Sequence, residues 1–188
     1  MVMPAASTDW TVDMVDALPD DGNRYEIIDG ELFVTPAPSD LHQLVVGAMY
    51  ARLRLYLQPS SIGRPLISPS DVRRDDRRHN RVQPDIFVVR LTDNARPSYP
   101  FDLRDLLLAV EVQSPGNPAY DYQTKRELYL DAGIPEYWIV SPEARTVARW
   151  RGSAQPAELV TERLEWQPAG MMSWFILDLP EFFEDAFG

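Results

Sequence analysis

The sequence contains no cysteine, and this absence excludes several kinds of site at once. A disulfide framework, a thiolate nucleophile and a zinc ribbon each require cysteine. No apolar run approaches the roughly 20 residues that cross a bilayer. The first residues, MVMPAASTDW, lack the basic and apolar segments of a secretory signal. We therefore expect a cytoplasmic protein that does not enter a membrane.

Motifs that identify common enzyme classes are missing as well. The sequence has no glycine-rich phosphate loop, no GxSxG, no HExxH and no metal-type spacing of histidine.

The composition is that of a folded domain. With 188 residues, 45% of them hydrophobic, the chain suits one domain with a sizeable core, and we expect that domain to span residues 1–188 with its core at about 24–150. The formal net charge is −11, with −8 in residues 1–40, −6 in residues 158–188 and +3 between them. Overall acidity usually argues against non-specific binding of nucleic acid, which depends on lysine and arginine, but here the acidity is confined to the two ends.

Lysine is nearly absent, since 17 of the 18 basic residues are arginine and Lys125 is the exception. A genomic bias toward arginine codons explains the excess of arginine. A lysine that survives such a bias suggests a position where a guanidinium cannot replace a compact ammonium group.

Apolar periodicity predicts alternating helices and strands. Residues 24–34, RYEIIDGELFV, are typical of a hairpin that turns at Asp29-Gly30, and residues 39–58 have helical spacing with Ser39 or Asp40 as the cap. Residues 106–113 form a nearly continuous apolar run, as in a strand covered on both faces. Further helices are expected at 9–18, 121–132 and 180–187, and further strands at 64–68, 85–89, 136–140, 146–150 and 157–161. This order predicts an α/β fold with a mixed β-sheet flanked by helices.

Two carboxylates lie on these predicted strands. Glu111 is near the end of the apolar run, where an unpaired charge is costly, and strand alternation places it on the same face as Gln113. Asp85, preceded by Pro84, begins another strand. If the two strands are neighbours, both carboxylates converge beside an amide oxygen. All-oxygen ligation of this kind suits Mg²⁺ or Mn²⁺.

Lys125 falls inside the apolar stripe of the helix that is predicted after this strand. An inward-facing lysine can reach the carboxylates, where it stabilises developing negative charge or positions an attacking water. Alternatively, it extends from the edge of the apolar face or makes an ordinary ion pair with Glu111.

Other candidates have weaker support. His42 lies in the first turn of the helix at 39–58 and is either a ligand or a solvated or capping residue. Glu26 and Glu31 in the hairpin could complete an acidic cluster, although hairpin carboxylates are usually exposed. The stretch VRRDDRRHNR at 72–81 either holds phosphates or neutralises itself through its aspartates.

Taken together, these residues resemble the PD-(D/E)XK nuclease superfamily. The match extends to its "putative restriction endonuclease" branch through an ordered series: YEIIDGEL (25–32), His42, QPDIFVV (83–89), LAVEVQSP (108–115), Asp121 with Lys125, and GIPEYWIV (133–140). The resemblance covers about residues 24–150 and implies a restriction-endonuclease-like core with Asp85 and Glu111 as metal ligands. Gln113 replaces the superfamily's lysine, which in this branch comes from the next helix, where Lys125 lies.

The sequence thus predicts a Mg²⁺- or Mn²⁺-dependent endonuclease that hydrolyses phosphodiester bonds in DNA. Its expected catalytic residues are Asp85, Glu111, Gln113 and Lys125, with Glu31 and His42 as further candidates, and a homodimer is expected. The main alternative is an inactive nuclease fold that binds nucleic acid or protein, which the acidic ends favour because nucleases usually present a larger basic face. A third possibility is an enzyme for a small phosphorylated or nucleotide substrate.

Overall fold

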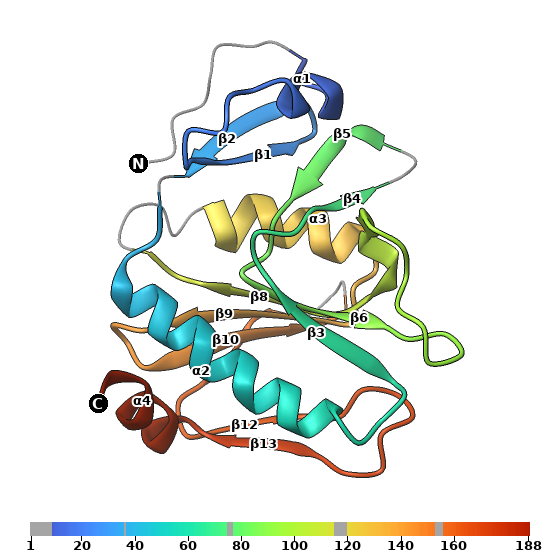
Figure 1. The fold of residues 1–188 in the computed structure, drawn as a ribbon. Coiled ribbons are helices and arrows are strands. Elements are labelled where there is room, and N and C mark those ends of the chain that lie inside the picture. Colours follow the sequence, from blue (N-terminus) through green and yellow to red (C-terminus); the bar gives the residue numbers. More distant parts are fainter. Residues whose placement is uncertain (1–8, 36, 75–76, 115–119, 153–155) are drawn as a thin grey trace.

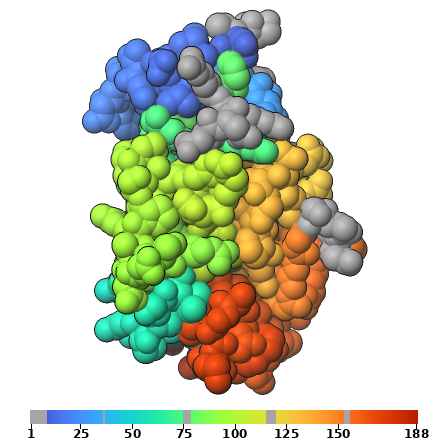
Figure 2. All heavy atoms as spheres, turned by 90° about the vertical axis from the view of Figure 1, so that its right-hand side faces the viewer, coloured from blue at the N-terminus to red at the C-terminus, as the bar shows by residue number. Residues whose placement is uncertain are grey.

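The structure, a computed structural model, describes residues 9–35, 37–74, 77–114, 120–152 and 156–188. Within them the strands form a six-stranded sheet, a five-stranded sheet and a two-stranded ribbon. Figure 1 shows the three stacked, with the five-stranded sheet at the top, the six-stranded sheet in the middle and the ribbon at the bottom. Figure 2 shows that the N-terminal segment and the C-terminal segment therefore lie at opposite ends of the molecule.

The six-stranded sheet is the centre of the fold. Its order is β11-β10-β9-β8-β6-β3, and β8 pairs with β9 in parallel while the other neighbours are antiparallel. The strands are β3 (Gly63–Ile67), β6 (Ile86–Arg90), β8 (Leu106–Val112), β9 (Glu136–Ser141), β10 (Thr146–Arg151) and β11 (Glu158–Val160). Every residue of β8 is buried, as its apolar run predicts. Because β6 and β8 are neighbours, with Ile86 opposite Val110, the ends that carry Asp85 and Glu111 lie together.

Side-chain alternation along the strands gives this sheet two apolar faces. On one face, Val110 and the other buried residues that point the same way pack against α2 (Asp40–Leu57) and α4 (Leu179–Phe187). They also pack against the ribbon of β12 (Arg163–Trp166) and β13 (Phe175–Asp178). On the opposite face, Ala109 and the other buried residues that point the same way pack against α3 (Arg126–Asp131) and the five-stranded sheet. Glu111, two residues after Ala109, points to this second face.

The five-stranded sheet covers the second face with the order β2-β1-β5-β4-β7. Its strands are β1 (Arg24–Ile28), β2 (Glu31–Thr35), β4 (Val72–Arg74), β5 (Arg77–Val82) and β7 (Phe101–Asp102), with the short helix α1 (Val12–Asp16) beside them and the 3₁₀ turn η1 (Leu103–Asp105) after β7. The predicted hairpin is present, and Asp29 and Gly30 have the positive φ values of 48° and 83° that such a turn requires.

The predicted helix at 121–132 has two parts. Residues Tyr120–Lys125 form a π-helical segment, η2, and α3 continues from Arg126. Sequence periodicity did not reveal this wider turn. Pro115, which ends one of the motifs, lies outside the described residues. Among the described residues, no helix is long and apolar enough to span a membrane.

Candidate active site

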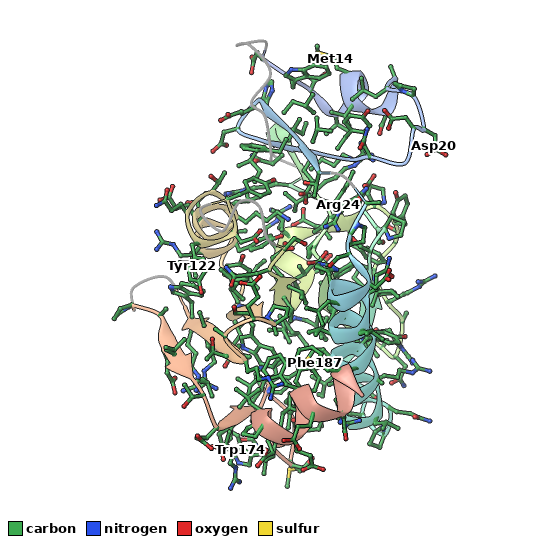
Figure 3. All side chains as sticks on the ribbon, turned by 90° about the vertical axis from the view of Figure 1, so that its left-hand side faces the viewer. Met14, Asp20, Arg24, Tyr122, Trp174 and Phe187 are labelled. Carbon is green, nitrogen blue, oxygen red and sulfur yellow. The ribbon has the colours of Figure 1, made fainter. Side chains whose placement is uncertain are left out.

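Five elements meet around a small cavity between the two sheets. β1 supplies Arg24 and Glu26, the first turn of α2 supplies His42, and Asp85 comes from the residue before β6. Glu111 comes from β8, and Asp121 and Lys125 come from η2. Their side chains line a cavity of about 70 Å³, called here the carboxylate cavity. Figure 3 shows Arg24 below the N-terminal hairpin, near the start of α2, with α3 seen end-on at the other side.

Asp85 is buried and accepts hydrogen bonds on both oxygens. Arg24 Nη1 donates to Oδ1 over 2.9 Å, while His42 Nε2 and the backbone N–H of Val112 donate to Oδ2, each over 2.9 Å. Burial alone would raise the pKa of Asp85, but the hydrogen bond from His42 and the charge of Arg24 outweigh it and hold the pKa well below its usual range. Asp85 is therefore ionised at neutral pH.

Glu111 is equally buried and pairs with different donors. Its Oε1 accepts from Lys125 Nζ over 3.0 Å and from the hydroxyl of Tyr129 over 2.8 Å. Burial raises the pKa of Glu111 well above its ordinary value, with a further contribution from the charge of Asp85 and in spite of Lys125. An additional positive charge next to Glu111 would therefore stabilise its ionised form.

Lys125 is 2% exposed and lies between two carboxylates. Its Nζ is 3.0 Å from Glu111 Oε1 and 3.1 Å from Glu26 Oε2, and it lies over the ring of Tyr120. Burial would lower the pKa of Lys125, but the charges of Glu111 and Glu26 raise it above its ordinary value. The expectation that Lys125 faces inward is thus confirmed, and its ammonium group is charged.

Glu26, which the sequence offers as a member of an acidic cluster with exposure as the alternative, is buried at the site. It is 1% exposed, accepts a 2.7 Å hydrogen bond from the backbone N–H of Gln83, and contacts Lys125. Ile28, which lies on the same face of β1, is also buried. The position of Glu26 on the face of an apolar residue was therefore a sequence signal for its burial. Glu31 is the reverse case: it lies next to the turn, is exposed, and does not reach the carboxylate cavity.

The remaining predicted residues have mixed outcomes. His42 is buried at the site rather than solvated, and its Nδ1 has no hydrogen-bond partner among the described residues. Gln113 lies one residue beyond β8, where its backbone N–H donates to Val140, and it is not among the described residues that line the carboxylate cavity. The structure therefore brings Asp85, Glu111, Lys125 and His42 together and leaves Gln113 aside.

The cavity holds more negative than positive charge. Among its described lining residues are four carboxyl groups, on Glu26, Asp85, Glu111 and Asp121, but two permanently charged cations, Arg24 and Lys125. Burial, helped by the charges of Asp85 and Glu26, raises the pKa of Asp121 to about 6. Burial is the main cause of the raised pKa values of Asp121 and Glu111, and the neighbouring carboxylates add to it, so a bound cation would favour the ionised form of both groups.

Mg²⁺ or Mn²⁺ fits this donor set, although the donors are already engaged. Within the described residues, no three His, Asp or Glu side chains are already grouped as a metal site. The oxygens of Asp85 and Glu111 instead accept hydrogen bonds from Arg24, His42 and Lys125. Hard carboxylate oxygens match these cations, so Asp85 and Glu111 would hold the ion once Arg24 releases Oδ1 of Asp85.

Three arginines of the arginine-rich stretch, Arg73, Arg74 and Arg81, are paired with carboxylates away from the carboxylate cavity. Arg73 and Arg81 both pair with the buried Asp71, and Arg74 pairs with Asp131 on α3. Their partners lie outside the stretch, and the alternative that it neutralises itself through Asp75 and Asp76 stays a prediction, because both aspartates lie outside the described residues.

Comparison with known proteins identifies the family and the fold. The family model Uma2, described as "Putative restriction endonuclease", matches residues 12–176. The structure is similar to the crystal structure of a "putative nuclease belonging to DUF820" from Anabaena variabilis ATCC 29413, with a TM-score of 0.76 and 19% identity over 94% of this chain and 99% of that one. This similarity confirms the mixed α/β fold, and no curated protein matches the sequence.

Proposed function

Because this chain belongs to the Uma2 family of restriction-endonuclease-like proteins, we propose that it is an endonuclease that uses Mg²⁺ or Mn²⁺ to hydrolyse phosphodiester bonds in DNA. One observation carries the proposal: a cavity between two sheets combines four carboxyl groups with a buried lysine and a partly buried arginine. Metal-dependent phosphoryl transfer needs this combination of ligands for a cation and positive groups for the phosphate.

The residues of the chain take separate roles in this reaction. Asp85 and Glu111 hold the cation, which lowers the pKa of a water molecule and polarises the phosphoryl oxygen when bound. His42 and the backbone of Val112 fix the orientation of Asp85 through their hydrogen bonds. Lys125 places a charged ammonium group beside Glu111, where it stabilises the negative charge that develops on the phosphate.

An inactive nuclease fold that serves as a binding module is the second candidate. The net charge of −11 and the pairing of Arg73, Arg74 and Arg81 favour it, because these features leave little basic surface for DNA. The two candidates differ in one outcome, namely whether DNA is cleaved when Mn²⁺ is present.

A cleavage assay with three variants tests the proposal. Wild-type protein should cut fluorescent DNA with Mn²⁺ and not with EDTA. Glu111→Gln should lose both Mn²⁺ binding and cleavage, whereas Lys125→Met should keep Mn²⁺ binding and lose rate by about 100-fold, as for removal of one charge-stabilising group. The exposed Glu31→Gln is the matched control and should behave like wild type. Cleavage by Glu111→Gln at the wild-type rate would rule the proposed site out.

The expected homodimer stays a prediction. Leu55, Trp174 and Ile176 are 67%, 53% and 52% exposed and line a shared groove, and apolar surface of this kind is common where proteins associate. Sedimentation equilibrium of wild type and Trp174→Ser distinguishes a dimer that uses this groove from a monomer.

A further inference from the structure

A second, larger cavity lies directly beside the carboxylate cavity. Its volume is about 410 Å³, within the range of small-molecule sites, and it is called here the side cavity. The two cavities share four lining residues: Arg24, Pro38, His42 and Asp85. A ligand that extends from the reacting phosphate could therefore continue into the side cavity without crossing another element.

The side cavity is charged at the end that it shares with the carboxylate cavity, and in the remainder of its described lining the exposed Asp20 is the one charged side chain. Arg24 is the cation at the end shared with the carboxylate cavity. The rest of the lining includes the amide groups of Asn23, Gln43 and Gln83 and the apolar side chains of Val46 and Pro69. A phosphate matches the first end, and a flat heteroaromatic base with hydrogen-bonding edges matches the remainder.

Two polar groups of the lining can still form hydrogen bonds to a ligand. The Nδ1 atom of the buried His42 has no hydrogen-bond partner among the described residues. The side chain of Gln43 is exposed on α2 and makes no hydrogen bond to any other described residue. A buried polar atom without a partner is uncommon in folded proteins and is explained most simply by a ligand or water that completes its bonding.

We propose that the side cavity is a nucleotide subsite that takes one unstacked nucleotide of single-stranded DNA, next to the phosphate that is cleaved. This inference rests on the proposed nuclease function and names the substrate class. Arg24 binds the adjacent phosphate, which also explains how Oδ1 of Asp85 becomes free for the cation. The base lies against Val46 and Pro69, with Gln43 at its edge.

The side cavity should bind a single strand more tightly than a duplex, because the energetic cost of placing a base in it differs. A base in a duplex must leave its stack and its partner to enter a cavity, at a cost of a few kcal/mol, whereas a base in a single strand does not have to break a pair. The paired arginines on β4 and β5 do not supply the basic face that would compensate this cost for a duplex.

Fluorescence anisotropy tests the subsite with Ca²⁺ in place of Mg²⁺, so that bound DNA is not cut. A labelled 12-nucleotide single strand should bind about tenfold or more tightly than its duplex, given the unstacking cost. Gln43→Ala should weaken binding of the single strand by about 3- to 10-fold, the range for one lost hydrogen bond. Val46→Phe, which fills the cavity, should weaken it further. Leu44→Ala, the exposed neighbour on α2 outside the cavity, is the matched control and should have no effect.

The outcomes separate this inference from the function on which it rests. Equal affinity for single strand and duplex, with no effect of Gln43→Ala or Val46→Phe, would overturn the subsite even if Mn²⁺-dependent cleavage is observed. Free dTMP that competes as tightly as the 12-nucleotide strand would also overturn it, in favour of a small-nucleotide site. Absence of Mn²⁺ binding and of cleavage would instead overturn the proposed nuclease function.

Discussion

Asp121 is a carboxyl group whose surroundings make ionisation unfavourable. Its pKa of about 6 lies above the ordinary 3.8 because of burial and the nearby Asp85 and Glu26, although Lys125 opposes the shift. A carboxyl group whose pKa is raised on folding costs stability once it ionises, so the free energy of unfolding falls as the pH rises from about 4 to about 6. Such a cost is common where residues serve a site rather than the fold.

Asp121→Asn should therefore stabilise the metal-free protein at pH 7.5 by about 1–3 kcal/mol, since it removes the charge but keeps the shape. The gain should disappear near pH 4, where the carboxyl group is protonated in the folded state. Thermal melts in EDTA at the two pH values measure it. Glu143→Gln, an exposed turn position, is the control, and an equal gain there would show that the effect comes from overall charge.

Asp71 is a second buried carboxylate, but its surroundings favour ionisation. Burial raises the pKa of Asp71, yet its bonds to Arg81 and Gln83 and the charge of Arg81 outweigh burial and lower the pKa. The stability that this pairing provides is present above pH 3.8 and is lost as the pH falls below it.

Asp71→Asn should lower the free energy of unfolding by about 2–4 kcal/mol at pH 7, because Arg73 and Arg81 lose their shared partner. Urea denaturation measures this loss. Asp185→Asn, whose pair with Arg52 is exposed, should cost less than 1 kcal/mol and is the control.

At the scale of elements, the π-helical segment η2 is the one most closely tied to the site. It spans Tyr120–Lys125 and places Asp121 and Lys125, four residues apart, on the same cavity. π-helical turns inside helices often occur at functional sites, because one extra residue changes which side chains face inward. α3 then continues with the ordinary register that buries Leu128 and Tyr129.

Deletion of Gln123 should convert η2 to an ordinary helical turn. α3 and Lys125 would keep their packing, while Asp121 would rotate by about 100° and leave the cavity. Mn²⁺ affinity should then fall by about tenfold or more, while the circular dichroism spectrum is retained. The exposed position tolerates Gln123→Ala, which serves as the control and should bind Mn²⁺ normally. Unchanged Mn²⁺ affinity in the deletion variant would show that Asp121 has no part in the site.

At the scale of the whole molecule, the charge distribution limits how DNA is held. The chain has a net charge of −11, with the excess in its two end segments, so a bound divalent cation should contribute much of the attraction for phosphate. Few direct phosphate contacts are expected, chiefly from Arg24 and Lys125.

The salt dependence of binding measures the number of these contacts. For a single strand, two or three contacts give a slope of about −2 in a plot of log affinity against log salt concentration. A slope near zero would favour the small-nucleotide alternative, and a slope of about −6 or steeper would indicate a basic surface that the described residues do not provide.

Much of the fold and part of the site followed from the sequence. The hairpin at Asp29-Gly30, the long helix and the buried strand were predicted because their signals are local. The convergence of Asp85 and Glu111 was predicted on the condition that their strands are neighbours, and the inward position of Lys125 was predicted from helical spacing. Glu26 was one of two hairpin candidates that the sequence could not separate, and Arg24 and Tyr129 were missed as members of the site, since their positions depend on how the hairpin and α3 pack over the central sheet. No local pattern encodes that packing.

The central claim is that Asp85 and Glu111 hold a divalent cation, and calorimetric titration with Mn²⁺ tests it most directly. Wild type and Glu31→Gln should show the same saturable binding, and Glu111→Gln, which keeps the volume of the side chain, should show none. Binding by Glu111→Gln that equals binding by wild type would contradict the account, because the cation would then lie elsewhere in the molecule.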